Sequence, residues 1–204
     1  HENGFLVLKN FADSQLCDKI LQKAKIHLEN KIAPIETEQE YMQNDIDKIT
    51  VRRLRQVYDR EEIFRNWMTN EKIRPILKQI LNDTPVLTLA HHNSIMTKLP
   101  FESTRTFWHQ DRRYWNFENN DLVSVWLSLG DEYLDNGLLE FIPKSHKITF
   151  EKEQFDEVDN FLDTHPKNIE LIKTKVHTNL QKGDVVLFHC KTLHHANKNS
   201  SDKP

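Results

Sequence analysis

The feature that most constrains the fold is a series of short segments, rich in β-branched and aromatic residues, that fills the chain after Pro85. Turn signals such as Asn119-Asn120-Asp121 and Lys182-Gly183-Asp184 separate these segments. Many short strands in succession favour a sandwich or a jelly roll. We expect strands at Val86–Ala90, Ser94–Thr97, Phe107–Asp111, Leu122–Leu129, Gly137–Ile142, Lys173–Thr178 and Asp184–Cys190.

The first 83 residues follow a different pattern. Helical spacing predicts a helix with Asp13 or Ser14 as its N-cap and an end near Asn30. The residues with this spacing are Leu16, Ile20, Leu21, Ala24 and Leu28. We expect two more helices over Glu61–Thr69 and Glu71–Leu81, and short strands over Phe5–Lys9 and Thr50–Val57. Residues 31–50 are polar and irregular, which predicts a loop.

These patterns predict one domain over residues 1–204 that is mainly β with flanking α-helices. Residues 1–83 are expected to form a mostly helical flank, and residues 84–204 a β core. Helices followed by strands suggest that the helices pack on one outer face of that core. A charged insert at Phe150–Leu162 is predicted to be helical over Phe155–Phe161.

Composition argues against several function classes. The net charge is −3 and no basic stripe is visible, so we expect no nucleic-acid partner. The longest apolar stretch, Leu122–Leu129, is too short to span a bilayer, and His1-Glu2-Asn3-Gly4 does not resemble a signal peptide. The two cysteines, Cys17 and Cys190, cannot build a disulfide framework, which fits a reducing, cytoplasmic location. The chain does not begin with Met, so we expect some N-terminal residues to be absent.

A His-x-Asp pair and a distant histidine cluster indicate a metal site. His109 and Asp111 are two residues apart, so on a strand both side chains point to one face and can reach one ion. Such a pair alone is weak evidence, because surface histidines often pair with carboxylates. The apolar segment Asp184–Cys190 contains His189 and is followed by His194 and His195. Buried histidines need partners, either a metal or backbone carbonyls. Two imidazoles and one carboxylate form the ligand set of a non-heme iron(II) site with open positions.

The residues alone do not choose among the three distal histidines. In an unbroken strand His189 and His195 would share one face and His194 the other, but a turn at Cys190-Lys191-Thr192 would reset this alternation. The adjacent pair His91-His92 precedes a predicted strand. Its side chains would point to opposite faces, so we do not expect it to act as a ligand pair.

Several blocks, in order, resemble the phytanoyl-CoA dioxygenase family over nearly the whole chain. They are Asn3 to Phe11, His109-Gln110-Asp111, Trp126 to Leu129, Asp135 to Lys147, and Gly183 through His194 to Asn199. The resemblance implies a double-stranded β-helix (jelly-roll, cupin-like) core that binds Fe(II), 2-oxoglutarate and O2. It also implies hydroxylation of an unactivated C–H bond of a small-molecule substrate, with succinate and CO2 as co-products.

The resemblance also assigns the ligands. It implies that His194 is the distal ligand beside His109 and Asp111, and that His189 and His195 are structural. Relatives that halogenate have a small residue in place of the carboxylate, so Asp111 favours hydroxylation. Family members bind the far carboxylate of 2-oxoglutarate on an arginine about eleven residues after the distal histidine. Counting from His194 reaches position 205, just past Pro204, and we therefore expect the chain to be cut short.

Other residues match family positions less specifically. Trp126, Ser94 and Arg55 match positions that line the co-substrate pocket, and Arg53 competes with Arg55. A core position explains Trp126 at least as well, and a solvated strand face is slightly favoured for the other residues. Arg112, Arg113 and Trp115 directly follow the metal motif and could receive an anionic substrate group, or form a solvated turn.

Two rival functions are compatible with the sequence. One is a non-catalytic metal-binding β-barrel, and the other is a metal-assisted hydrolase or isomerase on a cupin-like barrel that uses zinc or manganese. Neither the substrate nor the oligomeric state can be predicted.

Overall fold

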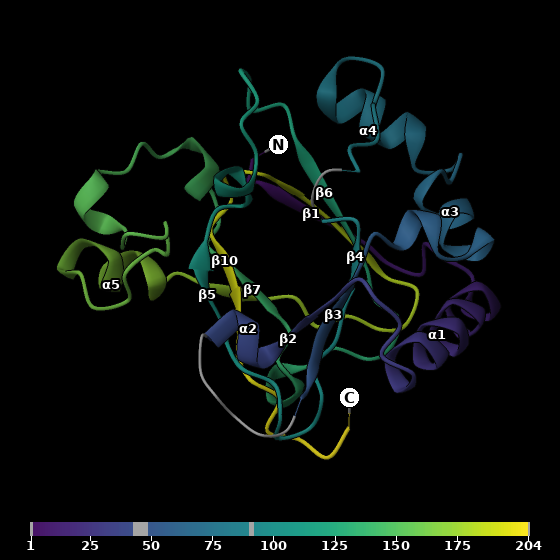
Figure 1. Cartoon of the computed structure of the whole chain (residues 1–204). Coiled ribbons are helices and arrows are strands. Elements are labelled where there is room, and N and C mark those ends of the chain that lie inside the picture. Colours follow the sequence, from purple (N-terminus) through teal and green to yellow (C-terminus); the bar gives the residue numbers. More distant parts are fainter. Residues whose placement is uncertain (1, 43–48, 90–91, 204) are drawn as a thin grey trace.

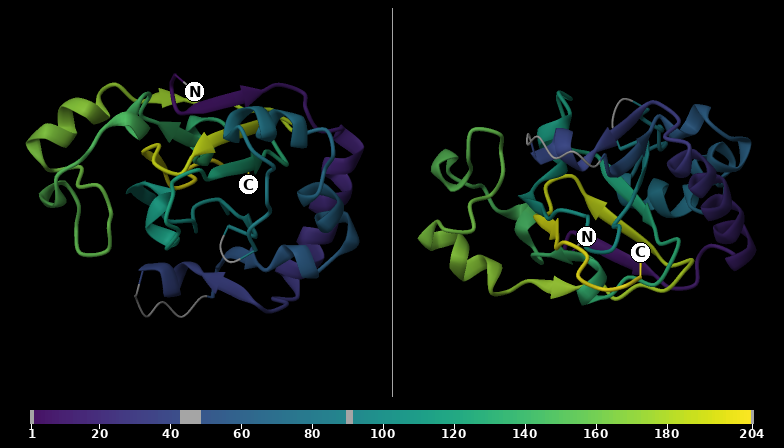
Figure 2. Two further views of the ribbon diagram at one scale, coloured as in Figure 1. Left: turned by 90° about the horizontal axis from the view of Figure 1, so that it is seen from above. Right: turned by 60° about the horizontal axis from the view of Figure 1, so that its bottom comes forward.

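The structure, a computed structural model, describes residues 2–42, 49–89 and 92–203. Antiparallel sheets lie at its centre, helices α1, α3 and α4 lie on one side, and the segment that contains α5 lies on the opposite side (Figures 1 and 2). This arrangement confirms the prediction of a mainly β chain with flanking helices. In the described residues, no helix is both long enough and apolar enough to cross a membrane.

The first sheet has four strands in the order β5-β10-β7-β8, and the second has three in the order β1-β9-β6. A third sheet, β2-β3-β4, is built from strands in the first half of the chain. The strands of the first two sheets are β5 Thr106–His109, β10 His194–Ala196, β7 Leu139–Phe141, β8 Val176–His177, β1 Phe5–Leu8, β9 Val185–His189 and β6 Val123–Leu127. Those of the third are β2 Ile35–Thr37, β3 Val51–Arg55 and β4 Ser94–Met96.

The core lies between the first two sheets. Phe141 of β7 is fully buried, and the ring of Phe5 from β1 stacks on it with a centroid separation of 4.8 Å. Strand β9 is buried on both faces: Val186 and Phe188 pack inside, whereas Leu187 packs outward with Ile76 and Leu77 of α4 (Arg74–Leu81). Burial on both faces explains the continuous apolar run in this strand.

Helix α1 spans Ser14–Glu29, and Asp13, one of the two predicted N-cap candidates, caps it. The Asp13 carboxylate accepts hydrogen bonds from the backbone N–H groups of Gln15 and Leu16 at 2.8 and 3.2 Å. The buried face of α1 packs with Leu54 of β3 and with α3 (Glu62–Met68). Three expected helices are therefore confirmed, with ends shifted by up to three residues.

The predicted loop at residues 31–50 was wrong in part. It contains β2, which pairs with β3, followed by helix α2 (Glu38–Met42), while residues 43–48 lie outside the described residues. Polar composition misled the prediction because Glu36 and Glu38 are buried against arginines of β3: Arg53 lies 2.6 Å from Glu36 and Arg52 lies 2.9 Å from Glu38.

The predicted strand at Val86–Ala90 was also wrong. Residues 86–89 have no regular structure and the Val86 side chain is 87% exposed, while Ala90 lies outside the described residues. An apolar run forms a strand only where a neighbouring strand is available to pair with it.

The insert also differs from the prediction. Residues 155–161 form no helix: the Asp156 carboxylate accepts hydrogen bonds from the N–H groups of Val158 and Asn160, which holds a turn. Helix α5 comes later, at Pro166–Ile172, and shortens the predicted strand at 173–178 to β8.

Candidate metal centre

Three buried side chains from two distant parts of the chain converge where β5 and β10 pair. His109 ends β5, Asp111 begins the 3-10 turn that follows, and His194 begins β10. The two histidines are directly paired across the sheet, with ring centroids 4.2 Å apart. Asp111 Oδ1 lies 3.5 Å from His109 Nε2 and 3.4 Å from His194 Nε2, and the three ligand atoms all lie within 4.8 Å of one another.

Backbone carbonyls fix the orientation of both imidazoles. His109 Nδ1 lies 2.8 Å from the Phe107 carbonyl oxygen, and His194 Nδ1 lies 2.9 Å from the Thr192 carbonyl oxygen. Because a carbonyl oxygen only accepts, each Nδ1 carries the proton and donates it. Each Nε2 therefore turns a lone pair towards the shared centre, which is the tautomer that a metal ligand requires.

The Asp111 carboxylate is 1% exposed and is only half satisfied. Its Oδ2 accepts a hydrogen bond from the Ser124 hydroxyl at 2.6 Å, whereas its Oδ1 has no hydrogen-bond partner among the described residues. A buried carboxylate oxygen without a partner is costly. A cation bound between Oδ1 and the two Nε2 atoms would satisfy it, so the residues present fit a metal ion.

Burial and neighbouring charges set the protonation states. Burial, aided by the adjacent His194, lowers the pKa of His109 to about 3, so this imidazole is neutral at pH 7. Burial alone would raise the pKa of Asp111, but the imidazoles of His194 and His92 outweigh it, and the pKa of Asp111 lies well below its usual range. A neutral imidazole and an ionised carboxylate are the forms that bind metals.

Two neighbours of the triad were not assigned a role from the sequence. Ser124 lies on β6 and orients Asp111. The sequence feature that could have identified Ser124 is its position on the predicted strand that follows the metal motif. His92, which we had set aside with His91, places its Nε2 3.3 Å from Asp111 Oδ1. His91 itself lies outside the described residues.

The other two distal histidines lie elsewhere. The turn at 190–192 separates β9 from β10, and the structure brings His194 rather than His189 or His195 to the pair. His195 points to the other face of β10, where its Nε2 contacts Glu140 and its ring packs on Trp108. His189 ends β9, and its Nδ1 accepts a hydrogen bond from the Lys191 N–H at 3.0 Å.

The residues matched to the co-substrate pocket have partners of their own. Trp126 packs against the core between the sheets and donates its indole N–H to Glu132 at 2.9 Å. Arg55 pairs across the sheet with Ser94, is about half exposed and forms an ion pair with Glu36. Arg53 binds the same carboxylate.

The residues matched to the substrate mouth form two hydrogen-bonded groups. Arg112 donates to Asn120 Oδ1 at 2.6 Å and to the carbonyls of Trp115 and Phe117, so it holds the loop that follows the motif. Arg113 donates to Asn160 Oδ1 of the insert at 2.7 Å and to the Tyr114 hydroxyl at 2.5 Å.

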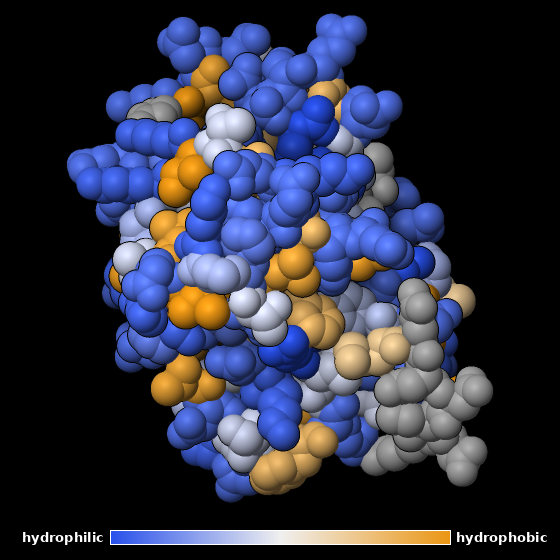
Figure 3. Space-filling view, turned by 90° about the vertical axis from the view of Figure 1, so that its left-hand side faces the viewer, coloured by the Kyte–Doolittle hydropathy of each residue, from blue (hydrophilic) through white to orange (hydrophobic). Residues whose placement is uncertain are grey.

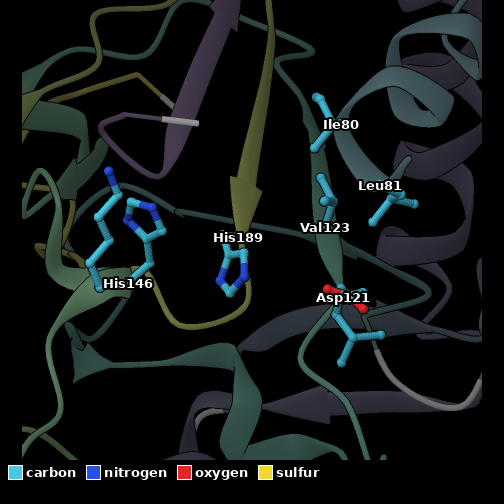
Figure 4. A pocket seen from close by; sticks show the side chains of 8 residues that line it. Ile80, Leu81, Asp121, Val123, His146 and His189 are labelled. Atoms are coloured by element: carbon cyan, nitrogen blue, oxygen red, sulfur yellow. The ribbon is translucent and has the colours of Figure 1, made fainter. Parts of the chain in front are cut away.

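A separate hollow lies on the outer face of the β1-β9-β6 sheet. It measures about 370 Å³ and is shown in Figure 4. Its lining comes from the end of α4, the start of β6 and the neighbouring turns, and comprises Ile80, Leu81, Asp121, Leu122, Val123, His146, Lys147 and His189. No member of the triad lines it. The face of the molecule on the left of Figure 1 is mostly hydrophilic, with small, scattered apolar groups (Figure 3).

Comparisons with known proteins identify the family and agree with this fold. The family model described as phytanoyl-CoA dioxygenase matches residues 1–204. The chain therefore belongs to the phytanoyl-CoA dioxygenase family. It is 25% identical to the peroxisomal phytanoyl-CoA dioxygenase of Bos taurus, over 98% of this chain and 62% of that protein. It is 24% identical to a probable alpha-ketoglutarate-dependent hypophosphite dioxygenase of Stutzerimonas stutzeri, over 98% of this chain and 71% of that one.

Solved structures show the same fold. EctD from S. alaskensis with bound Fe superposes with a TM-score of 0.78 at 18% identity, over 98% of this chain and 69% of that chain. The epimerase SnoN in complex with Fe3+, alpha ketoglutarate and nogalamycin RO superposes with a TM-score of 0.73 at 18% identity, over 99% and 75%. These likenesses confirm the predicted double-stranded β-helix core. The chain spans about 62% of the length of the cattle relative.

Proposed function

We propose that this chain is an iron(II)- and 2-oxoglutarate-dependent dioxygenase that hydroxylates an unactivated C–H bond of a small molecule. Succinate and CO2 are the expected co-products. The observation that carries the proposal is the convergence of two fixed imidazole lone pairs on one unsatisfied carboxylate oxygen, from His109, His194 and Asp111. This ligand set leaves positions open for a co-substrate and O2.

Iron bound at this site would supply the oxidising chemistry, and the protein's residues would bind and orient the reacting groups. His109, Asp111 and His194 would hold iron on one side only, and Ser124 would keep Asp111 oriented through its hydroxyl. Family membership supports 2-oxoglutarate as the co-substrate. We propose Trp126, Ser94 and Arg55 as the wall of its pocket. The arginine expected at position 205 stays a prediction.

We propose that the substrate enters beside the loop that follows the metal motif. Two contacts support a role for Arg113 there: it donates to the Tyr114 hydroxyl, and the Tyr114 ring lies 5.8 Å from the ring of His109. Trp115 follows Tyr114 directly in the chain. Arg112 braces the loop through the carbonyl oxygens of Trp115 and Phe117. A half-buried guanidinium at this position favours a substrate with an anionic group.

The decisive experiment measures succinate release from 2-oxoglutarate across a panel of small substrates, together with anaerobic binding of Fe(II) and 2-oxoglutarate. We expect a weak visible charge-transfer band and substrate-stimulated succinate release. Neither a non-catalytic metal-binding barrel nor a zinc or manganese hydrolase would show both. A metal-loaded protein that shows neither signal contradicts the proposal.

The Asp111→Ala variant tests the ligand assignment. It should abolish succinate release while the circular dichroism spectrum stays unchanged, because the substitution removes a ligand and no core packing. Asp121→Ala, an exposed aspartate ten residues further on, is the matched control and should retain activity. Full turnover in Asp111→Ala would refute the assignment.

We also propose a cytoplasmic location. Both cysteines, Cys17 and Cys190, are buried free thiols, which fits a reducing compartment. Imaging of a tagged full-length protein tests this location. The main alternative is the peroxisome, because the cattle relative is named as peroxisomal, and a peroxisomal signal would contradict the proposal.

A further inference from the structure

Three imidazole nitrogens lie at nearly the same distance from one carboxylate oxygen. The Nε2 atoms of His92, His194 and His109 lie 3.3, 3.4 and 3.5 Å from Asp111 Oδ1. Oδ1 is buried and none of these contacts is a hydrogen bond. Two ligands that bind one metal at about 2.0–2.2 Å and at right angles lie about 3 Å apart. The position of His92 relative to Oδ1 is therefore similar to that of the two triad histidines.

The backbone around His92 aims this side chain at the site. His92 has a φ of +57°, a left-handed conformation that is uncommon outside glycine. The next residue, Asn93, is buried and anchors the turn: its Oδ1 accepts the Tyr58 N–H at 2.9 Å and its carbonyl accepts the Val57 N–H at 3.2 Å. Strained backbone that is held by its surroundings is typical of functional sites.

Two aromatic rings complete the setting of His92. Its ring centroid lies 4.7 Å from that of Trp115 and 5.0 Å from that of Tyr114, both on the loop that follows the metal motif. The His92 side chain is nevertheless 30% exposed, unlike those of His109 and His194, which are 5% and 6% exposed. His92 is thus the one of these three imidazoles that contacts both the buried carboxylate and solvent.

We propose that His92 is a displaceable third histidine of this metal centre, which binds the ion at rest and leaves it when 2-oxoglutarate arrives. The inference rests on the proposed function. His92 is not among the three residues whose ligand atoms lie within 4.8 Å of one another, so its imidazole must swing inward to bind. Because co-substrate must compete with His92, the histidine weakens the apparent affinity for 2-oxoglutarate.

The variant His92→Ala tests this through two effects of opposite sign. We expect it to weaken the binding of Co(II) alone roughly tenfold and to tighten 2-oxoglutarate binding to the Co(II)-loaded protein by a similar factor. Isothermal titration calorimetry under anaerobic conditions measures both. A residue that only supports the fold would weaken both together. His165→Ala, which removes a histidine before α5, is the control and should change neither affinity.

Pulsed electron paramagnetic resonance of the Cu(II)-loaded protein counts the bound imidazoles directly. We expect three in the wild type, two in His92→Ala, and two in the wild type after addition of 2-oxoglutarate. Two imidazoles in the untreated wild type, or unchanged Co(II) affinity in His92→Ala, would overturn this inference and leave the proposed function intact. A wild type that binds no metal would overturn both.

Discussion

Two adjacent histidines, His194 and His195, lie beside buried carboxylates on opposite faces of β10, and the two carboxylates have very different surroundings. Glu140, beside His195, is fully buried and forms ion pairs with Lys175 at 3.0 Å and with His177 at 3.1 Å. Asp111, beside His194, has three imidazoles of the described residues near its Oδ1. Within the described residues, no lysine or arginine lies at ion-pair distance from it.

The difference shows what separates a structural ion cluster from a metal site. Both clusters bury a carboxylate among histidines, and a buried negative charge needs a compensating positive one. In the Glu140 cluster the Lys175 ammonium supplies that charge. In the Asp111 cluster the protein turns oriented lone pairs to the site instead, so a bound cation would supply the positive charge.

The largest expected effect, and the sharpest test of this comparison, is the loss of metal affinity when a histidine of the Asp111 cluster is removed. We expect His194→Ala to reduce Co(II) affinity by more than roughly 100-fold, since loss of a direct ligand exceeds the 10–100-fold loss typical of a supporting residue. His195→Ala and His189→Ala should stay within a few-fold of the wild type. Titration calorimetry measures all three. A greater loss in His189→Ala or His195→Ala would show that the wrong distal ligand had been chosen.

The second expectation concerns the hydroxyl that orients Asp111. Ser124→Ala should lower Co(II) affinity about 10–100-fold, because Asp111 Oδ2 loses its hydrogen bond and the carboxylate is free to rotate. Ser128→Ala is the matched control: that serine is also buried, but its hydroxyl donates to the Gly130 carbonyl. Equal affinities in the two variants would remove Ser124 from the site.

Acid should affect both clusters through their histidines. Burial is the main cause that lowers the pKa of His109 to about 3 and that of His195 to about 4. An unfolded imidazole titrates near pH 6.5. From pH 6.5 down to about 4, these two histidines therefore bind protons in the unfolded chain but stay neutral in the folded chain. Stability that is fully present above pH 6.5 is then lost as the pH falls, by about 1.4 kcal/mol per pH unit for each histidine.

Urea unfolding of the metal-free protein at several pH values checks this slope. The variant His195→Gln should remove about half of the stability change that His109 and His195 together cause between pH 6.5 and 4. An identical slope in the variant and the wild type would show that His195 titrates normally in the folded state.

The smallest expected effect concerns the cation of the structural cluster. Lys175→Met should lower the free energy of unfolding by about 1 kcal/mol, a value reduced because Lys175 is about one-third exposed. Metal affinity should not change. Lys173→Met, which removes an exposed ion pair with Glu170, should have no measurable effect on unfolding by urea. A change in Co(II) affinity in Lys175→Met would contradict the separation of the two clusters.

Local patterns predicted the elements that depend on local contacts. The N-cap at Asp13, the helices of the first 83 residues and the strand that carries His109 follow from periodicity and capping, which act over a few residues. The failures at Val86–Leu89 and Phe155–Phe161 arose where partners distant in sequence, or a carboxylate that caps a turn, outweighed local preference.

The sequence by itself determined the family and the proximity of His109 and Asp111, since residues two positions apart stay close without any tertiary contact. The expected strand face was wrong for Asp111, because β5 ends at His109 and Asp111 begins the 3-10 turn that follows. Strand alternation alone left His189, His194 and His195 open. The tertiary structure decided for His194, the residue that the family resemblance implies, because the turn between β9 and β10 sets which side of the sheet each imidazole occupies. It also decided that Ser124 and His92 approach Asp111. Their positions depend on strand pairing and loop packing across 13 and 19 residues of sequence, over which no local periodicity acts.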